Sequence, residues 1–268
     1  MASHSLLQAF KASKTAFGAW LTLPGTFHAR TVAQASPLLS WIVVDCEHGL
    51  IPLVPGVAEC TAAILGARPD GGPSTIVRIP ATGVTASSSW QIKHALDGGA
   101  QGVLVPLVST AAKAREVVSD CRFPPGGRRG FGSPFTHGTW GVSAAEYLKT
   151  ANDNILVMVQ IENKEAVENV QEIANVDGVD ALFIGPYDLS ISMGYPPPSP
   201  DPHPEMEQVM QKILNAAHAA GKKCAIFCTS GKQAAARAKQ GFDMINVTSD
   251  TGAMSEAIAS HINAASEQ

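Results

Sequence analysis

Short apolar runs separated by turn residues recur along the whole chain, and they predict buried strands. Many residues in these runs are β-branched, which is typical of strands covered on both faces. The predicted strands span residues 18–23, 41–45, 75–80, 102–107, 155–162, 181–186, 223–228 and 244–249. The first run reads GAWLTL and the fifth reads ILVMVQIE, so apolar positions dominate both.

Segments with helical spacing of apolar residues lie between these strands, and several of them finish in glycine, the expected helix stop. They span 28–36, 54–67, 88–99, 110–120, 163–176, 204–221, 231–241 and 251–265, and residues 1–15 predict a short N-terminal amphipathic helix. About eight strands alternating with about eight helices predict an α/β fold, a single (β/α)8 TIM barrel over residues 1–268. A doubly wound open sheet is the alternative, but no G-x-G-x-x-G follows the first strand to support a dinucleotide site.

Two irregular segments interrupt this alternation. Residues 123–140 read FPPGGRRGFGSPFTHGTW, and loops of this length are usually functional or disordered. We expect this segment either to fold over the active rim as a lid or to reach a neighbouring subunit. Residues 194–203 are rich in proline, which predicts stiff polyproline geometry leading into the long helix that follows.

Composition narrows the classes of partner. The net charge of −4 gives no basic surface, so we expect neither nucleic acid nor an anionic membrane as a partner. No apolar run approaches the roughly 20 residues that span a bilayer. Five cysteines, an odd number, without a secretory signal predict reduced thiols and a cytoplasmic location. For Cys224 and Cys228 we expect buried packing rather than zinc binding.

Polar side chains gather where the predicted strands end, which is where TIM barrels carry their active sites. Glu162 closes the fifth strand and Asp188 follows the sixth, so both carboxylates reach the same rim. Carboxylates without a neighbouring Cys or His suit a hard cation such as Mg²⁺ or Mn²⁺. For one acid alone a solvated loop charge or a helix cap is the simpler interpretation, so the hypothesis depends on their shared position. The other polar residues on this rim are Asp45, Glu47, His48, Arg78 and Gln160.

Six motifs, in order, carry a family resemblance. They are VDCEHG (44–49), VRIP (77–80), QIKHALDGGAQGVLVP (91–106), RRGFG (128–132), QIEN (160–163) and GPYDLSISMGYP (185–196). The chain resembles the HpcH/HpaI family of metal-dependent pyruvate aldolases, within the phosphoenolpyruvate/pyruvate barrel superfamily, from residue 18 to the last helix. The resemblance implies that Glu162 and Asp188 bind a divalent cation, Mg²⁺ or Mn²⁺ with Co²⁺ also possible. Most of the metal shell is then left to water and a 2-keto acid.

The resemblance also implies catalytic roles on the rim. Arg78 matches the arginine that stabilises the enolate and the developing alkoxide, although an arginine paired with a structural carboxylate is the alternative. His48 matches the catalytic base, and its ordinary pKa near 6.5 suits proton transfer at neutral pH. Asp97 matches an acid that raises the basicity of that histidine, and Asp45 matches a second acid close to the site.

Further matches concern the substrate. Gln160 is expected to hydrogen-bond the substrate or metal-bound water, and the backbone around Tyr187 and Asp188 is expected to receive the pyruvate carboxylate. Many relatives have a small residue where Tyr187 stands, so the pocket size bears on the aldehyde. Arg129 matches a loop arginine that meets the second substrate, with a surface or interface role as the alternative.

The resemblance therefore implies a class II aldolase that reversibly cleaves 4-hydroxy-2-keto acids to pyruvate and an aldehyde through a metal-stabilised enolate. The alternatives are an oxaloacetate decarboxylase, an enzyme like macrophomate synthase, or a non-catalytic keto-acid binder. Class I chemistry needs a Schiff-base lysine inside the barrel, and Lys164 more plausibly opens a helix. The expected partners are a small-molecule 2-keto acid, an aldehyde and further copies of the chain, as a hexamer or trimer with the C-terminal helix exchanged between neighbours.

Overall fold

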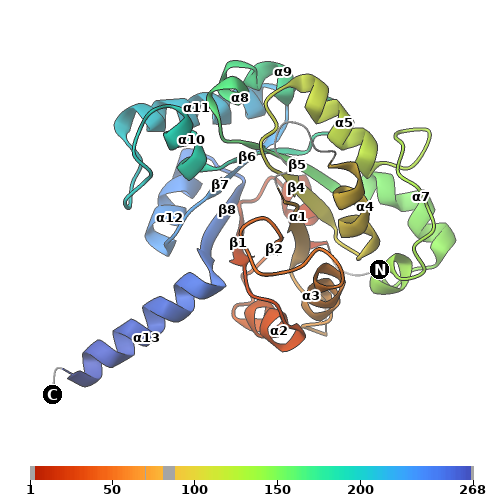
Figure 1. Ribbon diagram of the computed structural model, residues 1–268, viewed down its shortest axis with the longest axis horizontal. Coiled ribbons are helices and arrows are strands. Elements are labelled where there is room, and N and C mark those ends of the chain that lie inside the picture. Colours follow the sequence, from red (N-terminus) through yellow and green to blue (C-terminus); the bar gives the residue numbers. More distant parts are fainter. Residues whose placement is uncertain (1–3, 70, 81–87, 267–268) are drawn as a thin grey trace.

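Eight parallel strands close into one barrel in sequence order, which confirms the predicted (β/α)8 fold (Figure 1). The structure, a computed structural model, describes residues 4–69, 71–80 and 88–266. The strands are β1 (Ala16–Leu21), β2 (Trp41–Asp45), β3 (Ser74–Arg78), β4 (Gly102–Val105), β5 (Leu156–Ile161), β6 (Ala181–Ile184), β7 (Lys223–Phe227) and β8 (Met244–Ser249). Their bounds agree with the predicted runs to within a few residues, because continuous apolar runs are what a sheet buried on both faces requires.

Most of the helices cover the outside of the barrel. They are α1 (Ser5–Lys11), α2 (Thr26–Gln34), α3 (Gly56–Leu65), α4 (Ser89–Asp97), α5 (Ala111–Cys121), α6 (Thr136–Thr139), α7 (Ala144–Asn154), α8 (Lys164–Glu168), α9 (Val170–Ala174), α10 (Pro186–Ser192), α11 (Pro204–Ala219), α12 (Gly231–Gln240) and α13 (Asp250–Ser266). Three of them, α6, α7 and α10, were not predicted from the sequence. The predicted helix at 163–176 divides into α8 and α9 around Asn169.

The core has two apolar layers, one between sheet and helices and one inside the barrel. The inner layer includes Trp41, whose indole lies against Gly18 on the neighbouring strand. A Cβ on Gly18 would come within 2.0 Å of this ring, so the close approach requires glycine. Leu6 and Phe10 of α1 join the same inner layer. The predicted N-terminal helix is therefore confirmed over Ser5–Lys11, ends before residue 15, and residues 1–3 lie outside the described part of the chain.

The predicted lid lies at the other end of the barrel. Residues 123–140 follow α5 and precede α7 and β5, so they belong to the end where strands begin, and the active rim is where strands end. Trp140 fastens the segment there by donating from Nε1 to the carbonyl of Gly99, 2.9 Å away. The expectation of a lid is thus wrong, while the expected contact with a neighbouring subunit stays a prediction. The proline-rich residues 194–203 connect α10 to α11 without forming a helix or strand, and polyproline geometry there also stays a prediction.

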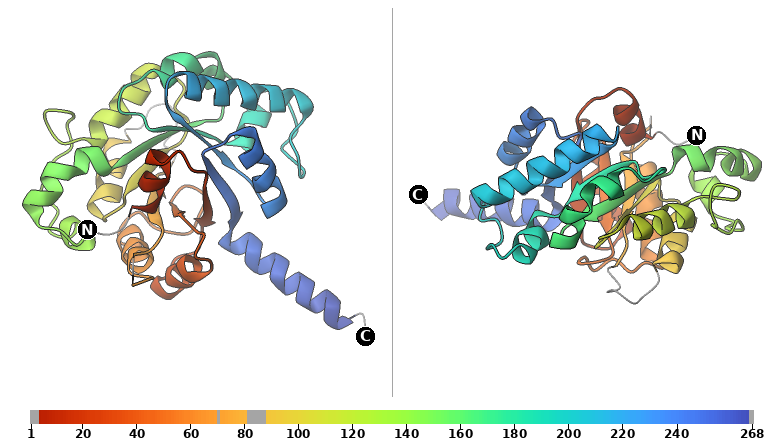
Figure 2. Two further views of the ribbon diagram at one scale, coloured as in Figure 1. Left: turned by 180° about the vertical axis from the view of Figure 1, so that it is seen from behind. Right: turned by 90° about the horizontal axis from the view of Figure 1, so that it is seen from above.

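The last helix, α13, stands away from the barrel and points into open space (Figures 1 and 2). Of its residues only Asp250 is buried. Met254, Ile258 and Ile262 are exposed at four-residue spacing, so they share one side of the helix. A groove of about 490 Å³ lined by residues of α2, β1 and β8 opens beside the first turn of α13.

All five cysteines are buried and none is in a disulfide, and the burial predicted for Cys224 and Cys228 is confirmed. Burial raises the pKa of the Cys228 thiol to about 12, so it packs as a neutral apolar group. Within residues 4–69, 71–80 and 88–266, no helix combines the length and apolarity that crossing a membrane requires.

Candidate active site

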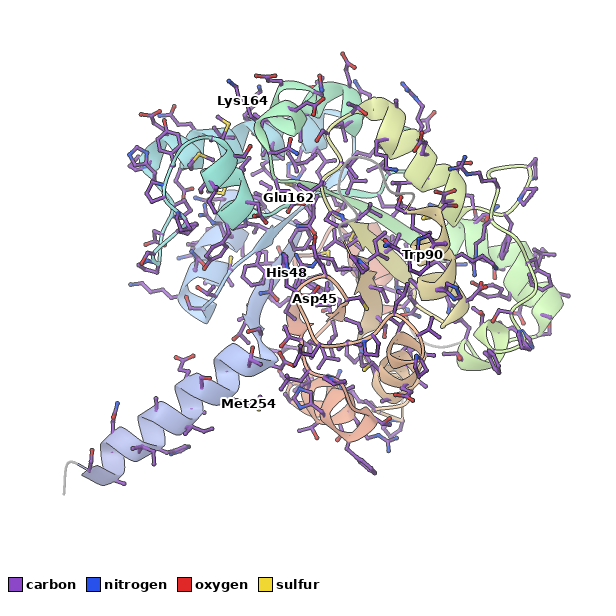
Figure 3. All side chains as sticks on the ribbon, viewed as in Figure 1. Asp45, His48, Trp90, Glu162, Lys164 and Met254 are labelled. Atoms are coloured by element: carbon purple, nitrogen blue, oxygen red, sulfur yellow. The ribbon has the colours of Figure 1, made fainter. Side chains whose placement is uncertain are left out.

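A cavity of about 480 Å³ opens at the rim where the strands end. Its lining comes from β1, β3, β5, β6 and β7, from the loops that follow β2, β5, β6 and β7, and from the first turn of α10. Asp45, His48 and Glu162 lie together over the middle of the barrel in Figure 3, whereas Lys164 lies at its outer edge. The cavity therefore collects most of the predicted rim residues, and the placement of Lys164 offers no support for class I chemistry.

Arg78 is held by two carboxylates from the neighbouring strand and its loop. Asp45 ends β2 and is the register partner of Arg78, which ends β3. Arg78 Nε donates to Asp45 Oδ1 at 2.8 Å and Nη2 donates to Oδ2 at 2.7 Å, while Nη1 lies 2.9 Å from Glu47 Oε2. The guanidinium also lies over the Trp20 ring, with Cζ 4.9 Å from the ring centroid. These contacts fix the plane and position of a permanent positive charge on the cavity wall.

Burial on its own would raise the pKa of Asp45, but the hydrogen bonds and charge of Arg78 outweigh it and lower that pKa below its ordinary value. Asp45 Oδ1 also accepts a hydrogen bond from the backbone N–H of Glu47 at 3.0 Å. Asp45 therefore stays ionised and supports Arg78 and the turn that carries His48.

Glu162 is a buried carboxylate that hydrogen bonds hold on both sides. Its Oε1 accepts from the backbone N–H of Leu107 at 2.6 Å, and its Oε2 accepts from Gln160 Nε2 at 2.7 Å. A Cβ on Gly185 would lie 2.7 Å from Oε2, so glycine leaves the room that this carboxylate needs. Desolvation, followed by the negative charges of Glu47 and Asp188, raises the Glu162 pKa to about 7.

Asp188 lies in the first turn of α10, which begins at Pro186, and its exposed side chain lines the cavity with Glu162. Gln160 Oε1 is buried and has no hydrogen-bond partner among the described residues. Two carboxylates and an unpartnered amide oxygen make an all-oxygen set, which fits Mg²⁺ or Mn²⁺. The described parts of the chain contain no group of three or more His, Cys, Asp or Glu side chains suited to a metal ion. A metal here would therefore leave several positions to small molecules.

His48 lines the cavity with 67% of its side chain exposed. Its Nε2 lies 3.8 Å from Glu47 Oε2, so the carboxylate nearest to the imidazole ring at the rim is that of Glu47. Asp97, the predicted partner of His48, lies elsewhere.

Asp97 and Arg129 pair with each other at the opposite end of the barrel, so the structure does not bring these two predicted site residues to the rim of their own chain, and their roles stay predictions. Asp97 is the last residue of α4, and α4 leads into the start of β4. Arg129 Nη2 donates to Asp97 Oδ1 at 3.0 Å, and Lys93 Nζ donates to Oδ2 at 2.7 Å. Arg129 also stacks over Phe123, 4.5 Å from the ring centroid. Within one chain, neither residue reaches the rim. Connections from a helix to the next strand lie where the strands begin, and the active rim lies where they end.

Aromatic residues are the part of the cavity that the sequence analysis missed. Trp20 on β1, Phe183 on β6 and Phe227 on β7 all line it, beside the predicted Tyr187. A signal was available for Phe227, which lies near the carboxyl end of the predicted strand 223–228, where side chains reach the site. Trp20 stands in the middle of the predicted strand 18–23, and it reaches the rim because β1 ends at Leu21. Leu107 was also missed, because its contribution to Glu162 is a backbone N–H.

Comparison with known proteins agrees with this geometry. The model of the family described as HpcH/HpaI aldolase/citrate lyase matches residues 21–257. A hydroxypyruvate/pyruvate aldolase from Rhizorhabdus wittichii is 34% identical over 244 residues, covering 91% of this chain and 91% of that protein. A 4-hydroxy-2-oxo-heptane-1,7-dioate aldolase from Shigella sonnei is 37% identical over 224 residues, covering 81% of this chain and 79% of that protein.

A solved structure also matches nearly the whole chain. An HpcH/HpaI aldolase/citrate lyase family protein from Burkholderia cenocepacia superposes with a TM-score of 0.87 at 30% identity, covering 98% of this chain and 99% of that one. The barrel, the rim residues and these matches lead to one assignment: the chain belongs to the HpcH/HpaI aldolase/citrate lyase family.

Proposed function

We propose that this chain is a class II aldolase that reversibly cleaves 4-hydroxy-2-keto acids to pyruvate and an aldehyde. The observation that carries the proposal is one cavity in which Glu162 and Asp188 face the fixed guanidinium of Arg78. The names of the similar proteins support it, since both curated relatives described above are aldolases.

Glu162 and Asp188 would hold a divalent cation, Mg²⁺ or Mn²⁺, and Gln160 Oε1 offers a further oxygen. When bound, the cation would supply positive charge that polarises the keto group of the substrate. The raised pKa of Glu162 supports this role, because desolvation and neighbouring acids leave that carboxylate short of positive charge. A cation would supply the missing charge.

The chain's own residues would do the rest. In cleavage, the C4 hydroxyl proton moves to an imidazole nitrogen of His48, the C3–C4 bond breaks, and the aldehyde carbonyl forms at C4. The electron pair of the broken bond passes into the enolate of pyruvate, which then gains a proton at C3. Arg78 stabilises negative charge on the substrate oxygens, and Asp45 and Glu47 keep its guanidinium in place.

The test is pyruvate release from a panel of 4-hydroxy-2-keto acids, with Mg²⁺ or Mn²⁺ and with EDTA. We expect release that EDTA abolishes and that Glu162→Gln removes, while Glu165→Gln, on the exposed side of α8, keeps it. Oxaloacetate belongs in the panel, since a faster rate on it would favour the decarboxylase that the sequence analysis kept as an alternative. Metal-dependent exchange of the pyruvate methyl protons excludes a non-catalytic binder. Full activity in EDTA-treated, metal-free protein would contradict the proposal.

We further propose that the chain forms a homo-oligomer in which α13 packs on a second copy. The groove beside α13 is lined largely by apolar atoms of α2, β1 and β8, where the eighth helix of a barrel would lie. The apolar side of α13 meanwhile has no cover among the described residues. The exposed side of α13 and the groove are both apolar. Packing the helix of one copy into the groove of another would remove both surfaces from water.

A further inference from the structure

Four aromatic side chains form a continuous strip on one wall of the active-site cavity. The Phe183 and Trp20 ring centroids are 5.5 Å apart, those of Trp20 and Phe227 are 5.2 Å apart, and those of Phe227 and Tyr187 are 6.3 Å apart. All three contacts are edge-to-face, the arrangement that aromatic pairs favour. Strands β1, β6 and β7 and helix α10 contribute one ring each.

The strip runs from the buried floor of the cavity to its mouth. Phe183 and Trp20 are 1% and 3% exposed, Phe227 is half-buried, and Tyr187 is 39% exposed. An exposed aromatic surface inside a cavity favours a ligand that removes it from water. Phe227 and Tyr187, at the outer end, are the rings with surface left to cover.

Charged groups occupy a different part of the same cavity. Glu162 and Asp188 are the proposed metal carboxylates, and Arg78 meets the aromatic strip at Trp20. Arg78 is the single lysine or arginine among the described residues that line the cavity, and it is already bound to Asp45 and Glu47. The lining thus offers no further permanent cation for a second substrate carboxylate, and burying an unpaired carboxylate is costly.

We infer that the aldehyde half of the substrate is uncharged and carries an aryl or bulky apolar group that packs on Phe227 and Tyr187. This inference rests on the proposed aldolase function and names the substrate class within it. The pyruvate half lies among the charged groups, and the substituent on C4 extends along the aromatic strip towards the mouth. The favoured substrates are therefore 4-aryl-4-hydroxy-2-keto acids.

The test compares kcat/KM for three cleavage substrates: 4-hydroxy-2-oxo-4-phenylbutanoate, 4-hydroxy-2-oxopentanoate, and 4-hydroxy-2-oxoheptanedioate. We expect the phenyl compound to exceed the methyl compound by about tenfold or more, the scale of discrimination that apolar contacts give. The compound with the terminal carboxylate should be poorest. Equal rates on all three, or fastest cleavage of the dicarboxylate, would overturn the inference.

Substitutions at Phe227 and Tyr187 test whether these rings cause the preference for the phenyl substrate. Phe227→Ala should lower the phenyl-to-methyl ratio of kcat/KM by about tenfold, and Phe227→Leu, which keeps apolar volume, should lower it less. Tyr187→Phe should keep the ratio because the ring rather than the hydroxyl makes the contact. Leu148→Ala, a half-exposed apolar side chain on α7, is the matched control and should change neither rate. A ratio unchanged in both Phe227 variants would contradict the assignment.

Exchange of the pyruvate methyl protons by the wild-type protein, measured without any aldehyde, separates the two proposals. Absence of exchange and of cleavage removes the aldolase function, and the inference with it. Exchange together with a missing phenyl preference leaves the function standing and overturns only the inference about the aldehyde.

Discussion

Leu107 has a left-handed backbone, with φ of 55°, at the point where its N–H reaches Glu162. Such a conformation costs a residue with a side chain about 1–2 kcal/mol, and glycine adopts it freely. The strain is located at the rim, next to a proposed metal carboxylate. Its direct effect is to aim one backbone donor at Glu162 Oε1.

Substitutions at Leu107 test this conformation. We expect Leu107→Gly to keep the free energy of unfolding within about 1 kcal/mol of wild type, because the relieved strain is offset by a more flexible unfolded chain. Leu107→Val should lower it by more than about 1 kcal/mol, since a β-branched side chain tolerates positive φ poorly. Urea denaturation measures both values. A valine variant as stable as wild type would exclude strain at this position.

Arg78 is the residue whose geometry matters most to the proposed chemistry. We expect Arg78→Lys to lower kcat/KM for pyruvate release by about a hundredfold or more, because one ammonium cannot replace a planar fork held by Asp45 and Glu47. Arg115→Lys, a change on the outer helix α5, is the matched control. Activity near wild type in the lysine variant would assign Arg78 a purely structural role.

The sequence was sufficient to identify most rim residues, because parallel strands deliver their carboxyl ends to one edge. It did not place Asp97 and Arg129 correctly within one chain, because they lie in segments that lead into strands rather than out of them. Motif matching alone does not distinguish these two ends of the barrel, whereas the order of helix and strand does. The hydrogen bond from Gln160 to Glu162 could not be predicted from the sequence either, since hydrogen-bond partners depend on side-chain positions.

At the scale of elements, α1 closes the end of the barrel where the strands begin, and His4 secures it. The His4 Nδ1 lies 2.9 Å from Ser74 Oγ, and Nε2 lies 3.2 Å from the carbonyl oxygen of Gln101. Burial lowers the His4 pKa from 6.5 to about 4, so the folded protein holds this imidazole neutral. The unfolded chain binds a proton there at a higher pH than the folded one.

Stability should therefore fall with acid through His4. Above pH 6.5 the imidazole is neutral in both states and adds no pH dependence, and between pH 6.5 and about 4 only the unfolded state gains the proton. Over that interval, protonation of His4 in the unfolded state would lower the free energy of unfolding by up to about 3 kcal/mol. We expect His4→Gln to be less stable than wild type at pH 7.5 and to lose less stability by pH 4.5, as measured by urea denaturation. His261→Gln, on the exposed part of α13, is the control, and parallel pH profiles for His4→Gln and wild type would contradict the assignment.

Elements missed by the sequence analysis have local causes. Helix α7 begins where the Ser143 side chain accepts a hydrogen bond from the backbone N–H of Glu146. Serine followed three residues later by glutamate is a helix-start signal, and it was available in the sequence. Helix α10 is short and begins at a proline, so its periodicity is too brief to recognise.

At the scale of the whole molecule, the order and closure of the strands and the family are confirmed. The oligomeric state could not be predicted from the sequence. The apolar residues of α13 have the same spacing as those of a helix that packs on its own barrel, so the pattern does not say which copy the helix contacts. The cytoplasmic location likewise stays a prediction.

Light scattering after gel filtration tests the assembly. We expect wild-type protein to have a mass several times that of one chain, and the double change Ile258→Glu with Ile262→Glu to give a much smaller species. Each change puts a charge on the apolar side of α13, where burial would be costly. Ser260→Glu, which lies about half a turn from Ile258, should leave the mass unchanged. A monomeric wild type would contradict the exchange of α13.

The detached position of α13 also has a consequence for how the protein reaches its native state. Closing the barrel pairs β1 with β8, which are far apart in the chain, and both strands precede α13. This closure is a first-order event within one molecule, whereas any burial of α13 on another copy is second order. Refolding should therefore begin with a phase whose rate is independent of protein concentration. It should finish with a phase whose rate increases with protein concentration. Removing α13 would abolish the second phase and spare the first.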